Sequence, residues 1–117
     1  MRQAHTVHDI RAAEKSLMAA LPPGTLMQRA AAGLATVCAQ LLSDGPGSYG
    51  SRVLVVAGGG DNGGDALFAG AALARRGVRV EALLVGSHAH EAGLAALRRC
   101  GGYVVQARDN RYDLVVD

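Results

Sequence analysis

The sequence has very few aromatic residues and no tryptophan, with one phenylalanine and three tyrosines among 117 residues. A platform that stacks nucleic-acid bases needs several aromatic side chains close together. The formal net charge of +2 is small, and the arginines are spread along the chain instead of forming one basic stripe. We therefore expect no nucleic-acid partner.

Long apolar runs are also lacking, because no stretch of the chain approaches the roughly 20 apolar residues that span a bilayer. The first residues, which include Arg2, His5 and Asp9, contain no apolar signal-peptide core. We therefore expect a cytoplasmic protein with no membrane partner. The two cysteines, Cys38 and Cys100, have no C-x-x-C spacing, and we expect both to be buried free thiols.

Glycine, by contrast, is abundant and is concentrated after one apolar stretch. Residues 52–57 (RVLVVA) are apolar and rich in β-branched residues, which predicts a buried strand. Residues 58–65 (GGGDNGGD) then combine five glycines with two carboxylates and one carboxamide. Such a density of glycine indicates that the backbone approaches something closely or takes positive φ values. We expect this segment to be the functional loop.

The remaining pattern predicts an α/β fold. We expect helices over residues 7–20, from Thr25 through Leu41, over 66–76, and from Ser87 or His88 to Gly101, and strands over 52–57, 78–85, 103–106 and 113–117. This order predicts a Rossmann-like three-layer sandwich with a parallel sheet and helices on both faces, preceded by two N-terminal helices. Residues 1–117 would form one domain. A doubly wound sheet normally has five or more strands, so we expect a chain truncated after the fourth strand.

The glycine-rich segment also contains the G-x-G-x-x-G pattern of dinucleotide-binding loops, beginning at Gly58, with Glu81 as the acidic residue that would hold a ribose. Two features disfavour this interpretation. Glu81 falls in the middle of the second strand, and Asp61 and Asp65 place two carboxylates where a pyrophosphate would lie. The loop therefore binds a less charged group or holds a cation. A Walker-type phosphate loop is excluded because no G-K-[ST] follows.

Four segments, in order along the chain, resemble the NAD(P)HX epimerase family, also called the YjeF N-terminal domain family. Residues 60–67 (GDNGGDAL) resemble its G-x-N-N-G-G-D-G signature, and residues 25–31 (TLMQRAA) resemble its L-M-E-R-A-G segment. Residues 113–117 (DLVVD) resemble the start of its D-x-x-x-D-A-L-F-G strand, and residues 6–14 (TVHDIRAAE) resemble its T-x-x-x-x-R-x-x-D opening. Four ordered matches are far more specific than one glycine-rich loop.

The resemblance implies an enzyme that interconverts the R and S epimers of hydrated NADH and NADPH, with a potassium ion in the site. The family's substrate-binding loop corresponds to Asp61, Asn62, Gly63, Gly64 and Asp65. Its potassium ligands correspond to Asn62 and Asp117. We expect both to reach one crevice, because the strands that precede them flank the switch point of the sheet. Oxygen ligands of low total charge suit a monovalent ion better than zinc.

This sequence departs from the family pattern at two positions of the signature, where Asp61 replaces an asparagine and Ala66 replaces a glycine. The family's acid/base carboxylate lies beyond Asp117, so the catalytic residue is unknown. For Asp65 we expect a role as the N-cap of a helix, in preference to a catalytic role. His88 and His90 are expected to be exposed or to cap a helix.

The resemblance also implies a homodimer and a dehydratase domain fused downstream. The alternatives are a non-catalytic dimerisation or ligand-binding module of the same fold, and a conventional nicotinamide dehydrogenase domain.

Overall fold

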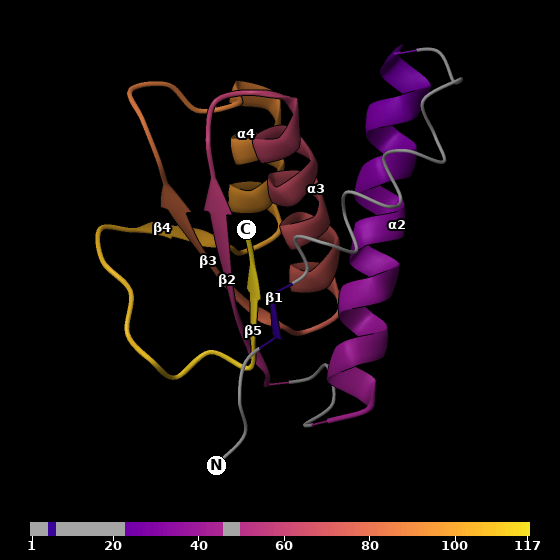
Figure 1. Cartoon of the computed structure of the whole chain (residues 1–117), viewed down its shortest axis with the longest axis vertical. Coiled ribbons are helices and arrows are strands. Elements are labelled where there is room, and N and C mark those ends of the chain that lie inside the picture. The colour runs from indigo at the N-terminus through magenta and orange to yellow at the C-terminus, as the bar shows by residue number, and fades with distance from the viewer. Residues whose placement is uncertain (1–4, 7–22, 46–49) are drawn as a thin grey trace.

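The computed structural model describes residues 5–6, 23–45 and 50–117. Within them, five strands form one sheet and three helices pack against it (Figure 1). The strands are β1 (His5–Thr6), β2 (Arg52–Ala57), β3 (Arg79–Leu84), β4 (Tyr103–Val105) and β5 (Leu114–Val116). The helices are α2 (Pro23–Ser43), α3 (Asp61–Arg75) and α4 (Glu91–Arg99). None of these helices is long and apolar enough to cross a membrane.

The strand order is β1-β5-β2-β3-β4, and all neighbouring strands run parallel. Parallel neighbours need a crossover connection, which α3 supplies between β2 and β3 and α4 supplies between β3 and β4. The chain adds β3 and β4 on one side of β2 and then returns to its other side with β5. The predicted α/β fold with a parallel sheet is confirmed, and its strand order reverses between β2 and β5.

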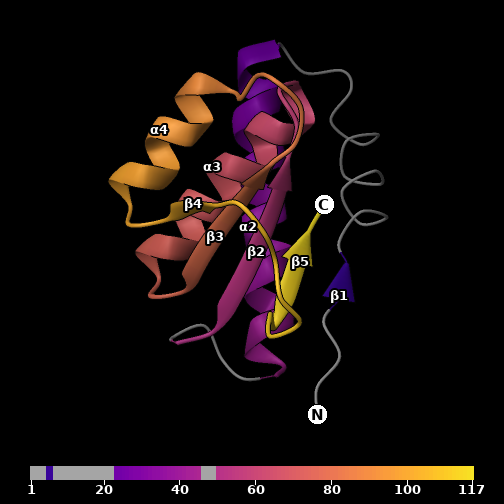
Figure 2. The same cartoon turned by 90° about the vertical axis from the view of Figure 1, so that its left-hand side faces the viewer.

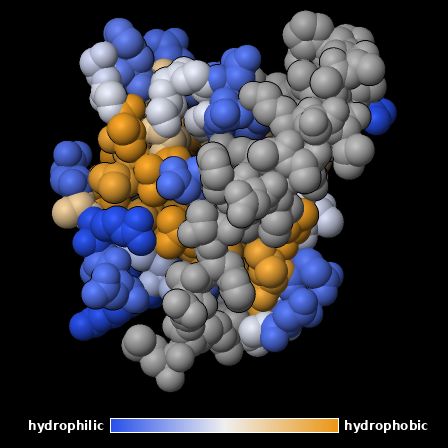
Figure 3. Space-filling model, in the orientation of Figure 1, coloured by the Kyte–Doolittle hydropathy of each residue, from blue (hydrophilic) through white to orange (hydrophobic). Residues whose placement is uncertain are grey.

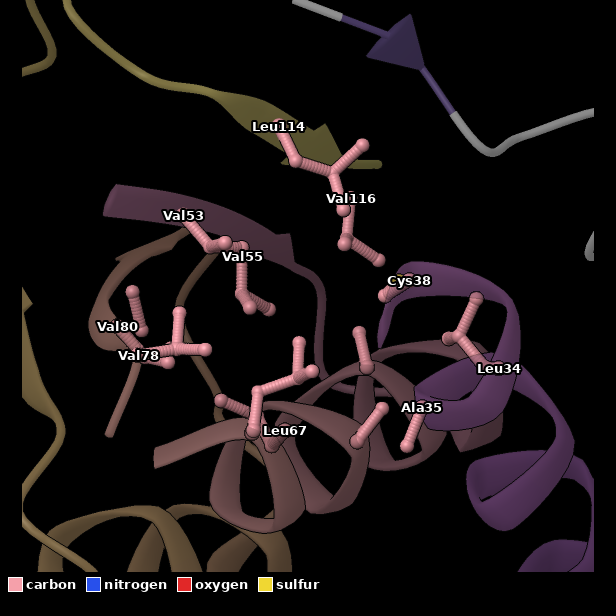
Figure 4. Packing of buried hydrophobic residues seen from close by; sticks show 14 of the residues in the cluster. Leu34, Ala35, Cys38, Val53, Val55, Leu67, Val78, Val80, Leu114 and Val116 are labelled. Carbon is pink, nitrogen blue, oxygen red and sulfur yellow. The ribbon is translucent and has the colours of Figure 1, made fainter. Parts of the chain in front are cut away.

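All three described helices cover one face of the sheet (Figure 2). Val53 and Val55 of β2 point to this face and pack with Leu67 of α3 and Cys38 of α2 (Figure 4). Full burial of each such aliphatic side chain contributes about 1.5–3 kcal/mol. Both cysteines are free thiols, and Cys38 is buried as predicted, whereas Cys100 is only partly buried.

The opposite face of the sheet carries a second, smaller apolar cluster. It consists of Leu54, Tyr112 and Val115, with the partly buried Val56, Leu83 and Val105 packed against it. No described helix contributes to this cluster. Figure 3 shows apolar residues exposed on the front of the molecule, bordered by hydrophilic ones. Within the described residues, helices therefore pack against only one face of the sheet.

The N-terminal part of the chain contains a strand that the sequence pattern does not predict. His5 and Thr6 form β1, which pairs in parallel with Leu114 and Val115 of β5. A strand of two residues leaves no periodic signal, and its pairing depends on a partner at the other end of the chain. The fourth predicted strand is consequently not the edge of the sheet. The helix predicted over residues 7–20 lies outside the described residues.

Each described helix begins away from its predicted start. The second predicted helix begins at Pro23, not at Thr25. Proline is tolerated in the first turn of a helix, because the N–H group that it lacks would have no acceptor within the helix. The helix predicted from Ala66 begins at Asp61. The helix predicted from Ser87 or His88 begins at Glu91. Sequence patterns locate helices more reliably than their ends.

Candidate functional site

The glycine-rich segment lies at the carboxyl edge of the sheet, between β2 and α3. Gly58, Gly59 and Gly60 form the loop, and α3 already begins at Asp61. This edge adjoins the reversal of strand order between β2 and β5, where open α/β sheets bind ligands. The expectation that residues 58–65 form one long loop is wrong, because its second half is helical. Tertiary packing of the helix outweighs the low helix propensity of glycine there.

The five predicted substrate-binding residues lie together in the first two turns of α3. Asp61 and Asn62 are exposed, whereas Gly63, Gly64 and Asp65 are buried. The first N–H groups of a helix have no partner within the helix, and they favour acceptor or anionic groups. Asp61 complements the positive end of the helix dipole. Of the five, the side chains of Asp61 and Asn62 are therefore the ones that a ligand from solvent can reach.

Gly63 has a structural reason to be glycine. A Cβ atom at this position would overlap the carbonyl oxygen of Gly58. At Gly58 and Gly60, by contrast, the place of a Cβ atom is open. No glycine between residues 58 and 64 has a positive φ. The close approach predicted from the glycines is confirmed for Gly63, and the partner is the backbone of the loop itself.

The loop between β3 and α4 packs directly on the glycine-rich segment. A Cβ atom on Gly59 would lie 3.0 Å from the carbonyl oxygen of His88, and one on Gly64 would lie 2.7 Å from Cδ2 of His90. His90 is the N-cap of α4, and its Nδ1 accepts a hydrogen bond from the backbone N–H of Gly93 at 3.1 Å. The capping predicted for His90 is confirmed. Its contact with Gly64 has no signal in the sequence, because it joins two segments through the fold.

Asp65 is not the N-cap residue of α3. The N-cap residue is Gly60, which has no side chain to accept a hydrogen bond. Asp65 lies in the second turn and is only 5% exposed. The expectation of an N-cap is wrong because α3 starts earlier than the sequence pattern predicts. A carboxylate is costly to bury unless it is hydrogen-bonded or paired.

Asn62 and Asp117 follow neighbouring strands, as predicted. β2 and β5 are paired up to Val55 and Val116, and Asp117 comes directly after β5. Both Asn62 and Asp117 are exposed at the carboxyl edge of the sheet. Among residues 5–6, 23–45 and 50–117, no three His, Cys, Asp or Glu side chains group as they do in a metal cluster. Asn62 and Asp117 as potassium ligands stay a prediction.

Glu81 has a structural role that excludes it as a ribose-binding carboxylate. It is the third residue of β3 and only 2% exposed. It accepts hydrogen bonds from Arg52 Nε at 2.7 Å, Tyr112 Oη at 2.8 Å and Tyr103 Oη at 3.2 Å. The hydrogen bonds from Arg52 hold the pKa of Glu81 below its usual value. With both oxygens engaged on the face away from α3, Glu81 does not serve the glycine-rich segment.

Comparison with known proteins places most of the chain in one family. A family model described as YjeF-related protein N-terminus matches residues 23–117. These residues include the whole glycine-rich segment, α3 and β5.

Curated relatives agree with this match. The bifunctional NAD(P)H-hydrate repair enzyme Nnr of Mycobacterium tuberculosis is 46% identical over 119 residues, covering 100% of this chain and 25% of the relative. The NAD(P)H-hydrate epimerase of Clavibacter michiganensis subsp. michiganensis is 48% identical over 99 residues, covering 85% of this chain and 40% of the relative. The enzyme Nnr of Corynebacterium glutamicum is 38% identical over 124 residues, covering 100% of this chain and 21% of the relative.

The chain thus spans between about a fifth and two fifths of the length of these relatives. The family model and the relatives agree with the resemblance carried by residues 25–31, 60–67 and 113–117. The chain belongs to the family of YjeF-related protein N-terminal domains.

Proposed function

We propose that this chain provides the substrate-binding part of an enzyme that interconverts the R and S epimers of hydrated NADH and NADPH. The observation that carries the proposal is the signature segment at residues 60–67, located at the switch point of the sheet in a chain of this family. The relatives named above are called NAD(P)H-hydrate epimerase or NAD(P)H-hydrate repair enzyme. The site has a glycine-rich helix start at the switch point of the sheet, but Glu81 does not serve as the ribose-binding acid of a dehydrogenase. Both features suit a repair reaction on a damaged dinucleotide better than hydride transfer.

The proposed substrate contacts come from the start of α3. The N–H groups of the first turn of α3, which have no carbonyl partner within the helix, and the exposed amide of Asn62 are the groups that would donate hydrogen bonds to the oxygens of a dinucleotide. Gly63 and Gly64 keep the loop backbone and the β3–α4 loop close to the helix. Asp61 adds a negative charge at the same end, which favours a cation between the loop and an anionic substrate.

The donor set fits a potassium ion. Asn62 contributes an amide oxygen and Asp117 a carboxylate, both exposed at the same edge of the sheet. Hard oxygen ligands with one formal charge suit a monovalent cation. When bound, the ion would supply positive charge near the substrate. Asn62 and Asp117 would hold it in place.

Epimerisation at C6 follows from the chemistry of the hydrated ring. The C6–O bond breaks as the ring nitrogen donates its lone pair, and the departing hydroxyl takes a proton to leave as water. Water then adds to the iminium from the other face and returns a proton. One carboxylic acid near C6 can donate the first proton and accept the second. The described part of the chain assigns this role to no residue.

The proposal is tested by following the R/S exchange of hydrated NADPH with the purified full-length protein. Potassium chloride is compared with sodium chloride at the same ionic strength. We expect exchange well above the spontaneous rate, and faster in potassium. No acceleration in either salt would contradict the enzymatic proposal and favour a non-catalytic ligand-binding module. Equal acceleration in both salts would contradict the potassium site alone.

A further inference from the structure

His90 lies against the signature segment although it belongs to another loop. The positions of its Cδ2, Cγ and Nε2 atoms are all within 3 Å of where a Cβ atom of Gly64 would be. Its ring also meets the edge of Phe68, with ring centroids 5.8 Å apart and an angle of 72° between the planes. Gly93 completes the contact, since a Cβ atom there would lie 2.9 Å from Cβ of Leu67. Glycines on both helices thus let the imidazole sit between α4 and the start of α3.

The cap on α4 fixes which nitrogen of His90 carries the proton. Nδ1 accepts the hydrogen bond from Gly93, so in the neutral ring the proton is on Nε2. Within the described part of the chain, His90 is only partly buried, and Nε2 is not among the buried side-chain atoms that lack a hydrogen-bond partner. A fixed N–H donor is therefore accessible beside Gly64, at the same edge as Asn62.

We propose that His90 is a further substrate-binding residue, whose Nε2–H donates a hydrogen bond to an oxygen of the dinucleotide bound at the start of α3. The proposal rests on the proposed function, because that function supplies the dinucleotide. A donor with a fixed ring orientation loses little rotamer entropy on binding. Phosphate and ribose oxygens are the acceptors that a dinucleotide offers.

Two variants separate the contact with substrate from the cap. Asparagine is a good N-cap, and its amide oxygen replaces Nδ1, so His90→Asn keeps the cap and removes the Nε2–H donor. The amide nitrogen of glutamine reaches the position of Nε2, so His90→Gln keeps a donor and gives up the cap. The exposed His88, two residues earlier on the same loop, provides the control His88→Asn.

The dissociation constant of hydrated NADPH is measured by calorimetry on the full-length proteins, together with their melting temperatures. We expect His90→Asn to weaken binding about tenfold at an unchanged melting temperature, which corresponds to one lost hydrogen bond. His90→Gln should melt lower yet bind within about threefold of the wild type. His88→Asn should change neither quantity.

Wild-type affinity in His90→Asn would overturn the proposal, as would an equal loss of affinity in His88→Asn. Tight binding by a wild-type protein that does not accelerate R/S exchange would contradict the proposed function and still leave the His90 comparison decisive. A wild-type protein that does not bind hydrated NADPH would overturn both.

Discussion

The glycines of the glycine-rich segment differ in the space that a side chain would have at each position. A methyl group on Gly63 would collide with the backbone of Gly58, whereas one on Gly58 would enter open space. We predict that Gly63→Ala lowers the free energy of unfolding by about 1–3 kcal/mol or more, although alanine is the better helix former. Gly58→Ala, as the matched control, should be nearly neutral. Urea denaturation measures both, and a stabilised Gly63→Ala variant would contradict the close approach.

Asp65 can be tested by a change that conserves volume. Asp65 is buried in the second turn of α3, close to the proposed substrate contacts, and it is not the N-cap residue of the helix. If Asp65 exchanges protons with the substrate, Asp65→Asn should slow R/S exchange by about 100-fold or more without weakening substrate binding to the same degree. The rate is measured with saturating hydrated NADPH. Near-normal exchange would remove Asp65 from the mechanism and leave it a structural role.

Glu81 makes stability depend on pH. Its pKa in the folded protein is lowered below the usual value of 4.5, mainly by hydrogen bonds from Arg52. The carboxylate therefore stabilises the fold above about pH 4.5, and this stabilisation is lost as the pH falls through the lowered pKa. Near neutral pH, we predict that Glu81→Gln lowers the free energy of unfolding by about 1–3 kcal/mol.

The Glu81→Gln variant and the wild type should become more alike as the pH falls through the lowered pKa of Glu81, because the wild-type carboxylate is then protonated as well. Asp109→Asn is the control, since Asp109 pairs with the same arginine but its side chain is 48% exposed. Its effect should be much smaller. A Glu81→Gln effect that does not shrink as the pH is lowered would contradict the ion pair as its cause.

At the level of elements, the position of β5 depends on contacts made before the strand begins. The backbone N–H of Arg52 donates to the Asp113 carboxylate at 2.8 Å, and the N–H of Asp113 donates to the Arg52 carbonyl at 2.8 Å. Tyr112 donates to Glu81 at 2.8 Å, and the Arg52 guanidinium lies 4.4 Å from the centre of the Tyr112 ring. These contacts hold the start of β5 beside β2, and so decide where Asp117 emerges.

Removing one hydroxyl tests this arrangement. We predict that Tyr112→Phe costs about 1 kcal/mol and speeds hydrogen exchange at the amides of β5. Tyr103→Phe removes the second tyrosine hydroxyl that donates a hydrogen bond to Glu81. Tyr103 is 44% exposed, and its hydrogen bond is longer, at 3.2 Å. Its effect on β5 should be smaller. Faster exchange in the Tyr103→Phe protein than in the Tyr112→Phe protein would contradict the role of Tyr112.

At the scale of the whole molecule, the two faces of the sheet are covered unequally. The edge beside β5 is paired with β1, so an open edge there is not a reason for low stability. The apolar face formed by Leu54 and Val115 receives no described helix.

The sequence patterns predict much of this architecture. The apolar stretch at residues 52–57 and the alternation of strands and helices after it are local or periodic signals, and the structure confirms the parallel sheet that they indicate. The start of α3 was not predictable in the same way, because glycines weaken a helix signal. Packing against the loop and against His90 makes these residues helical.

The sequence by itself determined the fold class, the position of the glycine-rich segment at residues 58–65 and the family to which the chain belongs, because these depend on periodicity and on ordered short motifs. Only the tertiary structure decided that Gly63 and Gly64 accommodate the protein's own loops, that Glu81 pairs with Arg52, that β1 covers β5, and that His90 lies beside the signature segment. The physical reason is that, apart from the contact of Gly63 with Gly58, these contacts join residues far apart in the chain, whereas a sequence pattern describes only neighbouring residues.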